Sequence, residues 1–340
     1  MRIKTLFFVL LTTLISCNNE KKQESKFAEV KNLSEFEKTD FIPTLEHKIS
    51  DEKNSVYCVT LLYAWDEVRE IINLPLEIPA DNHDLTLLNN SKSFVDVLKK
   101  NEYKVSGNVD GDLITARAEF SKSLPFEIKL DNFKNRLIFD NQSVASFGIT
   151  AAYSYYEQLK IVRIVYYKND NNFIIKLLPK DQKHEMILFK TDKVFTSMAE
   201  MNEEIIKLSE IGEKERKEEK QSWKYYYVNY EDEVVIPKLN FNLETNFSTL
   251  EGKEFKTTEQ EYRIKTAWQR TAFLLDESGA EVESEAEAVV ECVEDIEDYE
   301  KPKPKKMIFD KDFLILLKRT DSQNPYFGLW VVNTELMIKE

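Results

Sequence analysis

The side chains that most often carry catalysis or bind metals are scarce and scattered in this chain. The three histidines, His47, His83 and His184, stand in polar contexts, and none lies at a helical spacing from another possible metal ligand. Gly107 and Gly111 are isolated in a turn and form no phosphate-binding loop, and the chain has no Gly-x-Ser-x-Gly elbow. We therefore expect no enzyme activity, no metal site and no cofactor. We also expect the three histidines to lie at the surface.

The unusual feature is an acidic stretch at 276–300, where twelve of the twenty-five residues are acidic and none is basic. The odd positions from 281 to 287 are all glutamate, whereas the even positions are small or apolar: Ala280, Val282, Ser284, Ala286, Ala288 and Val290. A period of two predicts a strand with one small-residue face and one face in water. Four glutamates on one face repel each other, and an exposed edge of this kind risks association. A segment that is a solvated loop in one state and a central strand in another reconciles these observations.

The N-terminus carries a processing signal. Arg2 and Lys4 precede an apolar run at 6–15 that is too short to span a bilayer, and Leu-Ile-Ser-Cys at 14–17 resembles a bacterial lipobox. We expect residues 1–16 to be removed as a signal peptide, Cys17 to carry lipid, and residues 17–40 to form a tether. Asn18 permits outer-membrane sorting, so we expect a lipid-anchored protein of the bacterial cell envelope, with the leaflet left open. The alternative is an ordinary secretory signal with a chance cysteine.

The composition limits the class of protein and the kinds of partner that are possible. The chain has 340 residues, of which 42% are hydrophobic, so we expect one globular domain at 41–340. Three cysteines are too few for a disulfide scaffold, and we expect no disulfide between Cys58 and Cys292. A formal net charge of −14 repels polyanions, which makes nucleic acid an unlikely partner. We expect a monomer.

The apolar patterns predict strands around a few helices, without regular βα alternation, which is typical of the α+β class. A buried strand from Asn54 runs into a helix that ends before Pro75, a helix capped by Ser91 covers 91–105, and a long helix covers 191–221. The remaining runs, rich in β-branched or aromatic residues, predict strands at 113–120, 136–139, 159–167, 172–178, 223–228, 233–241, 262–275, 306–318 and 325–333.

Five segments, in order along the chain, resemble serpins. They are Phe173–Asp181, Ile236–Phe241, Ile264–Glu281, Phe309–Lys318 and Phe327–Asn333, and the third looks like the serpin strand that runs into the hinge of the reactive loop. The resemblance implies a serpin-like α+β fold with mainly antiparallel central sheets, surrounding helices and an exposed reactive-site loop. The N-terminal half departs from the family: Cys58-Val59 replaces Ser-Pro, and the chain between Leu76 and Leu113 is too short for the usual helices. We therefore expect a shortened N-terminal half.

The same resemblance implies a protease inhibitor that acts by cleavage of a loop at about 276–306 and insertion of its hinge as a strand. The implied hinge residues are Glu277, Gly279, Ala280, Glu281, Val282, Ser284 and Ala286. Family spacing puts the scissile bond near Val293-Glu294, with Cys292, Ile296 or Tyr299 as further candidates, which implies a serine or cysteine protease as partner. The membrane is the other expected partner, through the N-terminal lipid. The alternative is a non-inhibitory serpin-like lipoprotein that binds or scaffolds, and the glutamates at 283 and 285 bear on the choice because they interrupt the small residues needed for insertion.

Overall fold

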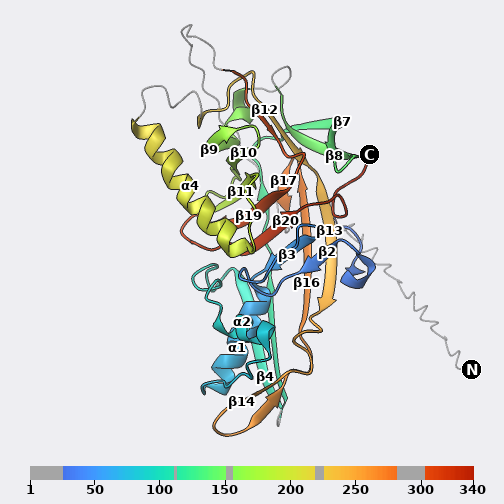
Figure 1. The fold of residues 1–340 in the computed structure, drawn as a ribbon, viewed down its shortest axis with the longest axis vertical. Coiled ribbons are helices and arrows are strands. Elements are labelled where there is room, and N and C mark those ends of the chain that lie inside the picture. Colours follow the sequence, from blue (N-terminus) through green and yellow to red (C-terminus); the bar gives the residue numbers. More distant parts are fainter. Residues whose placement is uncertain (1–25, 111–112, 151–155, 219–225, 282–302) are drawn as a thin grey trace, which may run out of the picture.

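The structure is a computed structural model that describes residues 26–110, 113–150, 156–218, 226–281 and 303–340 (Figure 1). Its sheets carry most of the buried side chains, and its few helices lie outside them (Figure 1). The predicted α+β class is therefore confirmed. Among the described residues, no helix combines the length and apolarity needed to cross a membrane.

A seven-stranded sheet forms the centre of the core. Its strands lie in the order β2 (Thr39–Phe41), β3 (Asn54–Cys58), β20 (Phe327–Val331), β19 (Phe313–Arg319), β11 (His184–Lys190), β10 (Asn172–Leu177) and β9 (Val162–Asn169). Every residue of β3, β20, β19 and β11 is buried, so these strands are covered on both faces. The long helix α4 (Met198–Glu218) packs on β9, and Gly212 allows the close approach, since a Cβ there would lie 2.1 Å from the Val165 carbonyl oxygen.

A five-stranded sheet contains residues Gly279–Glu281 of the predicted hinge. Its order is β1 (Lys31–Asn32), β13 (Leu239–Asn246), β16 (Trp268–Asp276), β17 (Gly279–Glu281) and β6 (Leu124–Pro125). β13 and β16 pair along their whole length in an antiparallel register. β17 turns back from β16 and pairs with β6 on its other side.

Three smaller sheets complete the β structure. One has the order β18 (Lys306–Ile308), β12 (Glu233–Pro237), β8 (Gln142–Ile149) and β7 (Asp131–Phe139). The other two are hairpins, formed by β4 (Tyr103–Asp110) with β5 (Leu113–Phe120) and by β14 (Glu254–Lys256) with β15 (Glu261–Arg263).

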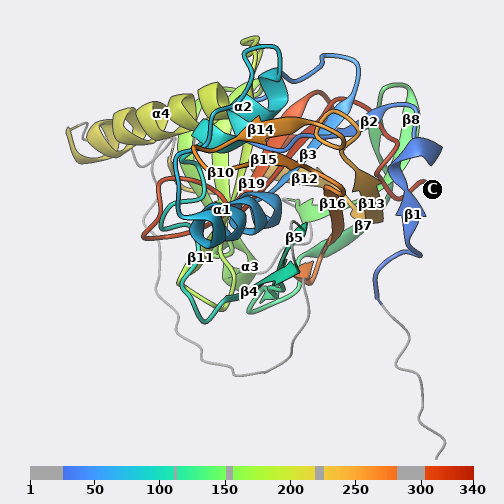
Figure 2. The same ribbon diagram turned by 90° about the horizontal axis from the view of Figure 1, so that it is seen from below.

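The first half of the chain adds short helices. These are the 3₁₀ turn η1 (Leu33–Glu35), α1 (Thr60–Ile72), α2 (His83–Asn90) and α3 (Tyr156–Leu159). The predicted strand from Asn54 into a helix before Pro75 is confirmed by β3 and α1. α1 lies alongside β5, against which it packs (Figure 2).

The predicted helix at 91–105 is wrong. Ser91 is the C-cap of α2 and does not begin a helix, and Asp96 has a φ of 56°, which breaks any helix through this segment. Phe94, Val97 and Leu98 are buried, but turns hold them there. The apolar spacing was correct as a sign of burial and wrong as a sign of helix.

Other boundaries shift. The helix expected at 191–221 begins at Met198, and the strand expected at 223–228 is not present over its described part, 226–228. Two long predicted strands each divide in two, because the 306–318 run breaks between β18 and β19 and the 262–275 run between β15 and β16. β11 was not predicted.

The expectation that all three histidines lie at the surface is also wrong. His83 is exposed, but His47 and His184 are 8% and 2% exposed. Both buried rings lie close to carboxylates, His47 near Asp84 and His184 near Glu102, and these partners are distant in the sequence. Cys58 is a buried free thiol, whereas Cys292 lies outside the described residues.

Candidate functional site

The turn between β16 and β17 is built for one residue type at its centre. Gly279 has a φ of 125°, and a Cβ at this position would lie 2.4 Å from the Leu124 carbonyl oxygen. No other residue type fits both the dihedral angle and the space. The Asp276 carboxylate accepts a hydrogen bond of 2.7 Å from the Ser278 N–H and closes the turn. The chain therefore reverses here into a new strand.

That new strand is short but paired on both sides. Ala280 lies opposite Leu275 of β16 and opposite Leu124 of β6, and it is fully buried. The turn is also tied down by backbone bonds, since the Phe126 N–H donates to the Ser278 carbonyl over 2.8 Å. A small side chain at 280 is what this packing allows.

An ion pair holds the end of β16. Lys238, in the link between β12 and β13, pairs with Glu277, and their side chains are 12% and 22% exposed. Burial opposes ionisation of Glu277, but the hydrogen bond and the charge of Lys238 outweigh it and hold the pKa of this carboxyl below its usual range. The pair fixes the base of the turn to the neighbouring strand link.

Below β17 a groove of about 1040 Å³ separates β5 from β16. Within the described chain, β5 pairs only with β4, and the 268–273 part of β16 pairs only with β13, so each strand turns a free edge toward the groove. Its floor is apolar and comes mainly from one face of α1 and from the β14–β15 hairpin: Leu61, Ala64, Trp65, Val68, Phe255 and Tyr262. β17 lies at one end of this groove.

The charged residues that line the groove are mostly basic and exposed. They are Arg117, Arg263, Lys265 and Arg270, with Glu119 as the one acid. This balance is opposite to that of the whole chain, which has 47 basic and 61 acidic residues. The groove thus combines an apolar floor with a cationic rim, which suits an anionic strand with one apolar face.

Two buried polar side chains of β16 face the same space. Gln269 donates to the Thr271 hydroxyl over 3.2 Å, while its Oε1 is buried and has no hydrogen-bond partner among the described residues. An unsatisfied buried acceptor is costly unless something supplies a donor. Burial raises the pKa of the nearby Cys58 thiol, so this cysteine is kept in its unreactive form.

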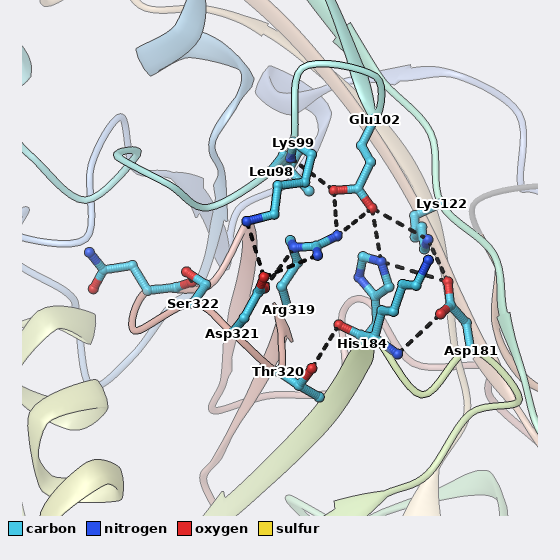
Figure 3. Close-up of polar contacts among 12 residues, drawn as sticks. Leu98, Lys99, Glu102, Lys122, Asp181, His184, Arg319, Thr320, Asp321 and Ser322 are labelled. Carbon is cyan, nitrogen blue, oxygen red and sulfur yellow. Dashed lines mark hydrogen bonds and ion pairs between the residues drawn. The ribbon is translucent and has the colours of Figure 1, made fainter.

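A second polar cluster includes Lys122, which stands two residues before β6 (Figure 3). Glu102 accepts two hydrogen bonds of 2.8 Å from Arg319, and His184 Nε2 lies 3.1 Å from Glu102 Oε1. Lys122, which stands between β5 and β6, donates to Asp181 over 2.8 Å (Figure 3). The cluster therefore connects the β5–β6 link to the turn before β11 and to the end of β19.

The electrostatics of this cluster follow from burial and pairing. Burial opposes ionisation of Glu102, but the Lys99 N–H and the Arg319 guanidinium hold its pKa below the usual range. Burial, followed by the charge of Lys122, lowers the pKa of His184. The Nδ1 of His184 is buried without a partner among the described residues, which fits a neutral ring that donates from Nε2.

The chain that follows the acidic segment is held differently from β17. Lys305 and Asp232 form an ion pair of 2.7 Å in which both side chains are at most 3% exposed. The Lys190 ammonium donates to the Ile308 carbonyl over 2.7 Å and to Asp310 over 2.6 Å. β18 adds backbone pairing to β12. This flank is fixed by buried charges as well as by a strand.

The structure brings part of the predicted site together. Glu277, Gly279 and Ala280 form the turn described above, and Glu281 ends β17. The other predicted positions lie outside the described residues: Cys17, Val282, Ser284, Ala286, Cys292, Val293 and Glu294. Sequence reasoning missed Lys238 as the partner of Glu277, the basic rim and the cluster around His184. Strand alternation in 113–120, with Arg117 and Glu119 at outward positions, was the available signal for the rim.

Solved structures similar to this chain include three that share 10–12% of its residues. They are thyroxine-binding globulin in complex with thyroxine (10% identity, 80% of this chain and 66% of that chain, TM-score 0.37), a serpin from the trematode Schistosoma haematobium (12%, 66% and 58%, 0.35) and the native state of tengpin, a thermophilic serpin (10%, 75% and 64%, 0.35). The chain spans less than two thirds of the length of each. No family model and no curated protein matches the sequence.

Proposed function

We propose that this protein is a protease inhibitor of serpin type, in which cleavage of the acidic segment lets its hinge side insert as a strand between β5 and β16. The single observation that carries the proposal is the position of β17. It is a three-residue strand, paired on both sides, at the end of a groove flanked by two free strand edges. A strand that continues β17 would complete the sheet.

The observed register supports this insertion. Continued beyond Glu281, it would place Val282 opposite Phe273 and Ser284 opposite Thr271, both buried positions of β16. The glutamates at odd positions would then fall on the exposed face, where Arg270 lies opposite position 285. Small side chains would meet the apolar floor and acids would meet the basic rim. Their charge would cost little, because it stays in water.

In this proposal the target protease catalyses the cleavage, and this chain then holds the protease as a covalent complex. The nucleophilic oxygen or sulfur of the protease attacks a carbonyl carbon near Val293-Glu294, the amine of the next residue leaves, and an acyl-enzyme forms. Insertion then draws the acyl-enzyme away before water can release it. We extend the proposal to a lipid anchor at Cys17 that holds the inhibitor in the bacterial cell envelope.

The test is to incubate the Cys17→Ser form with serine and cysteine proteases of apolar or small-residue specificity and to look for a complex that survives SDS. We expect such a complex and a rise in melting temperature of the cleaved protein. Cleavage without an SDS-stable complex and without a rise in melting temperature would reject inhibition. The alternative, a non-inhibitory lipoprotein that binds or scaffolds, would then be the better hypothesis.

A variant isolates the hinge. Val282→Arg would place a charge opposite buried Phe273 only once the strand inserts, so it should abolish complex formation while cleavage continues. Glu283→Arg, at the neighbouring position that insertion would leave on the exposed face, is the matched control and should leave inhibition intact. Equal inhibition by Val282→Arg and by the unsubstituted chain would contradict insertion. For the anchor, Cys17→Ser should move the protein from the membrane fraction to the soluble fraction.

A further inference from the structure

The segment 26–32 lies against the strand pair that borders the groove. The Ala28 N–H donates to Asn240 Oδ1 over 2.9 Å, and the Asn240 amide donates back to the Lys26 carbonyl over 3.2 Å. The Asn242 amide donates to the Ala28 carbonyl over 3.1 Å. Two asparagine side chains of β13 thus hold an extended backbone that then continues as β1, parallel to β13.

The same segment reaches the groove. Phe27 is half-buried and lines the groove together with Arg270 and Ala272 of β16. Asn242 connects the two, because its Oδ1 accepts a 2.8 Å hydrogen bond from Arg270 Nε while its amide holds Ala28. One side chain of β13 therefore fixes both the N-terminal segment and a basic residue of the groove rim.

We propose that residues 26–32 form a strap that covers part of the groove mouth with Phe27 and, through Asn242, restrains Arg270 on β16. A strand that enters the groove beside β16 would meet Phe27 and Arg270, so release of the strap would favour strand entry. The strap lies nine positions from Cys17, so a lipid anchor there would act almost directly on it. Its role in regulating insertion rests on the proposed function, whereas its restraint of β16 does not.

The experiment measures amide hydrogen exchange at 267–273 in the full chain carrying Cys17→Ser. Phe27→Ala and Asn242→Asp should each raise exchange there roughly five-fold, because local opening becomes easier when the strap is released. Asn242→Asp is the sharper variant, since the carboxylate still accepts from Arg270 but repels the Ala28 carbonyl. Val30→Ala, in the same segment at a residue that is 44% exposed, is the control and should change nothing.

Two outcomes overturn the strap. One is unchanged exchange at 267–273 in both Phe27→Ala and Asn242→Asp, and the other is an equal rise in Val30→Ala. Because the measurement needs no protease, the strap is tested even where no SDS-stable complex forms. The regulatory consequence is checked in the protease assay, where Phe27→Ala should raise the ratio of complex to cleaved product. If exchange at 267–273 becomes faster but the ratio of complex to cleaved product does not change, the strap restrains β16 without regulating insertion.

Discussion

The acidic segment is flanked by two strands of equal length that are held in different ways. β17 precedes it and is held by the Gly279 turn, by residue pairs with β16 and β6, and by the partly exposed Lys238–Glu277 ion pair. β18 follows it and is adjacent to a buried ion pair and to buried Lys190, which donates to the Ile308 carbonyl and to Asp310. The charges that hold the second flank are therefore more deeply buried than those that hold the first. In the proposed mechanism the first flank moves after cleavage and the second stays bound, and this difference in burial is consistent with that mechanism.

The largest effect should come from the fixed flank. Lys305→Met leaves Asp232 buried without its partner charge and should lower the free energy of unfolding by about 3–5 kcal/mol. Lys306→Met, at the exposed neighbouring position, is the control and should stay within about 0.5 kcal/mol of the unsubstituted chain. Chemical denaturation measures both. Similar losses of unfolding free energy in Lys305→Met and Lys306→Met would show that the buried ion pair does not hold the second flank.

The turn before β17 gives the next effect. Gly279→Ala combines an unfavourable φ with a clash against Leu124 and should cost about 1–3 kcal/mol. Gly252→Ala is the matched control, because its φ is also positive, at 77°, but no atom lies within 4 Å of the added Cβ. Denaturation midpoints compare the two. A cost for Gly279→Ala no larger than that for Gly252→Ala would mean that the turn is not tightly packed.

The ion pair at the base of the turn predicts a pH dependence. Since the pKa of Glu277 is lowered on folding, its stabilisation is present above the unfolded value near 4.5 and is lost as pH falls through the folded value. Glu277→Gln should therefore be less stable than the unsubstituted chain at pH 7, and the difference should shrink as the pH falls below about 4.5. Unfolding free energies at a series of pH values test this. A difference that is constant with pH would exclude the ion pair as its cause.

The smallest effect on stability should come from the polar cluster around His184 and Glu102. Since burial lowers the pKa of His184 from 6.5, the unfolded chain binds its proton first, and stability falls as pH drops below 6.5. His184→Gln should remove part of this loss. His47→Gln serves as the comparison, because burial lowers the pKa of that ring too but it lies near Asp84, outside the cluster.

Hydrogen exchange locates the effect of acid. Mild acid should lower the protection factors of the amides at 123–126 and 279–281, on the side of β17, more than those at 305–310. His184→Gln should reduce this difference in protection. Equal increases on the two sides would contradict a role for the cluster in holding β6.

The sequence predicted the parts of the fold that local patterns determine. The continuous apolar run of β19 and the switch from β3 to α1 are recognisable without any partner. The 91–105 segment failed because turns as well as helices can bury apolar residues at that spacing. β11 was missed although all of it is buried.

The site could be predicted only where it is local. The Glu277 turn is encoded by neighbouring residues, and Gly279 is its clearest sign. The Lys238 partner is 39 positions away, and Glu102 and Arg319 meet across 217 positions. Contacts at these separations depend on how sheets assemble, which a single sequence does not specify. The groove arises in the same way, from β5, α1 and β16 together.

The seven-stranded sheet also bears on how the chain is made. β20 lies between β3 and β19, with Trp330 paired to Ser55, so the centre of the core joins the two halves of the sequence. During synthesis, the edge of β3 that pairs with β20 stays unpaired until β20 has been made. Contacts of such high sequence separation form slowly. The topology therefore leaves the centre of the core incomplete until residue 331 has been made.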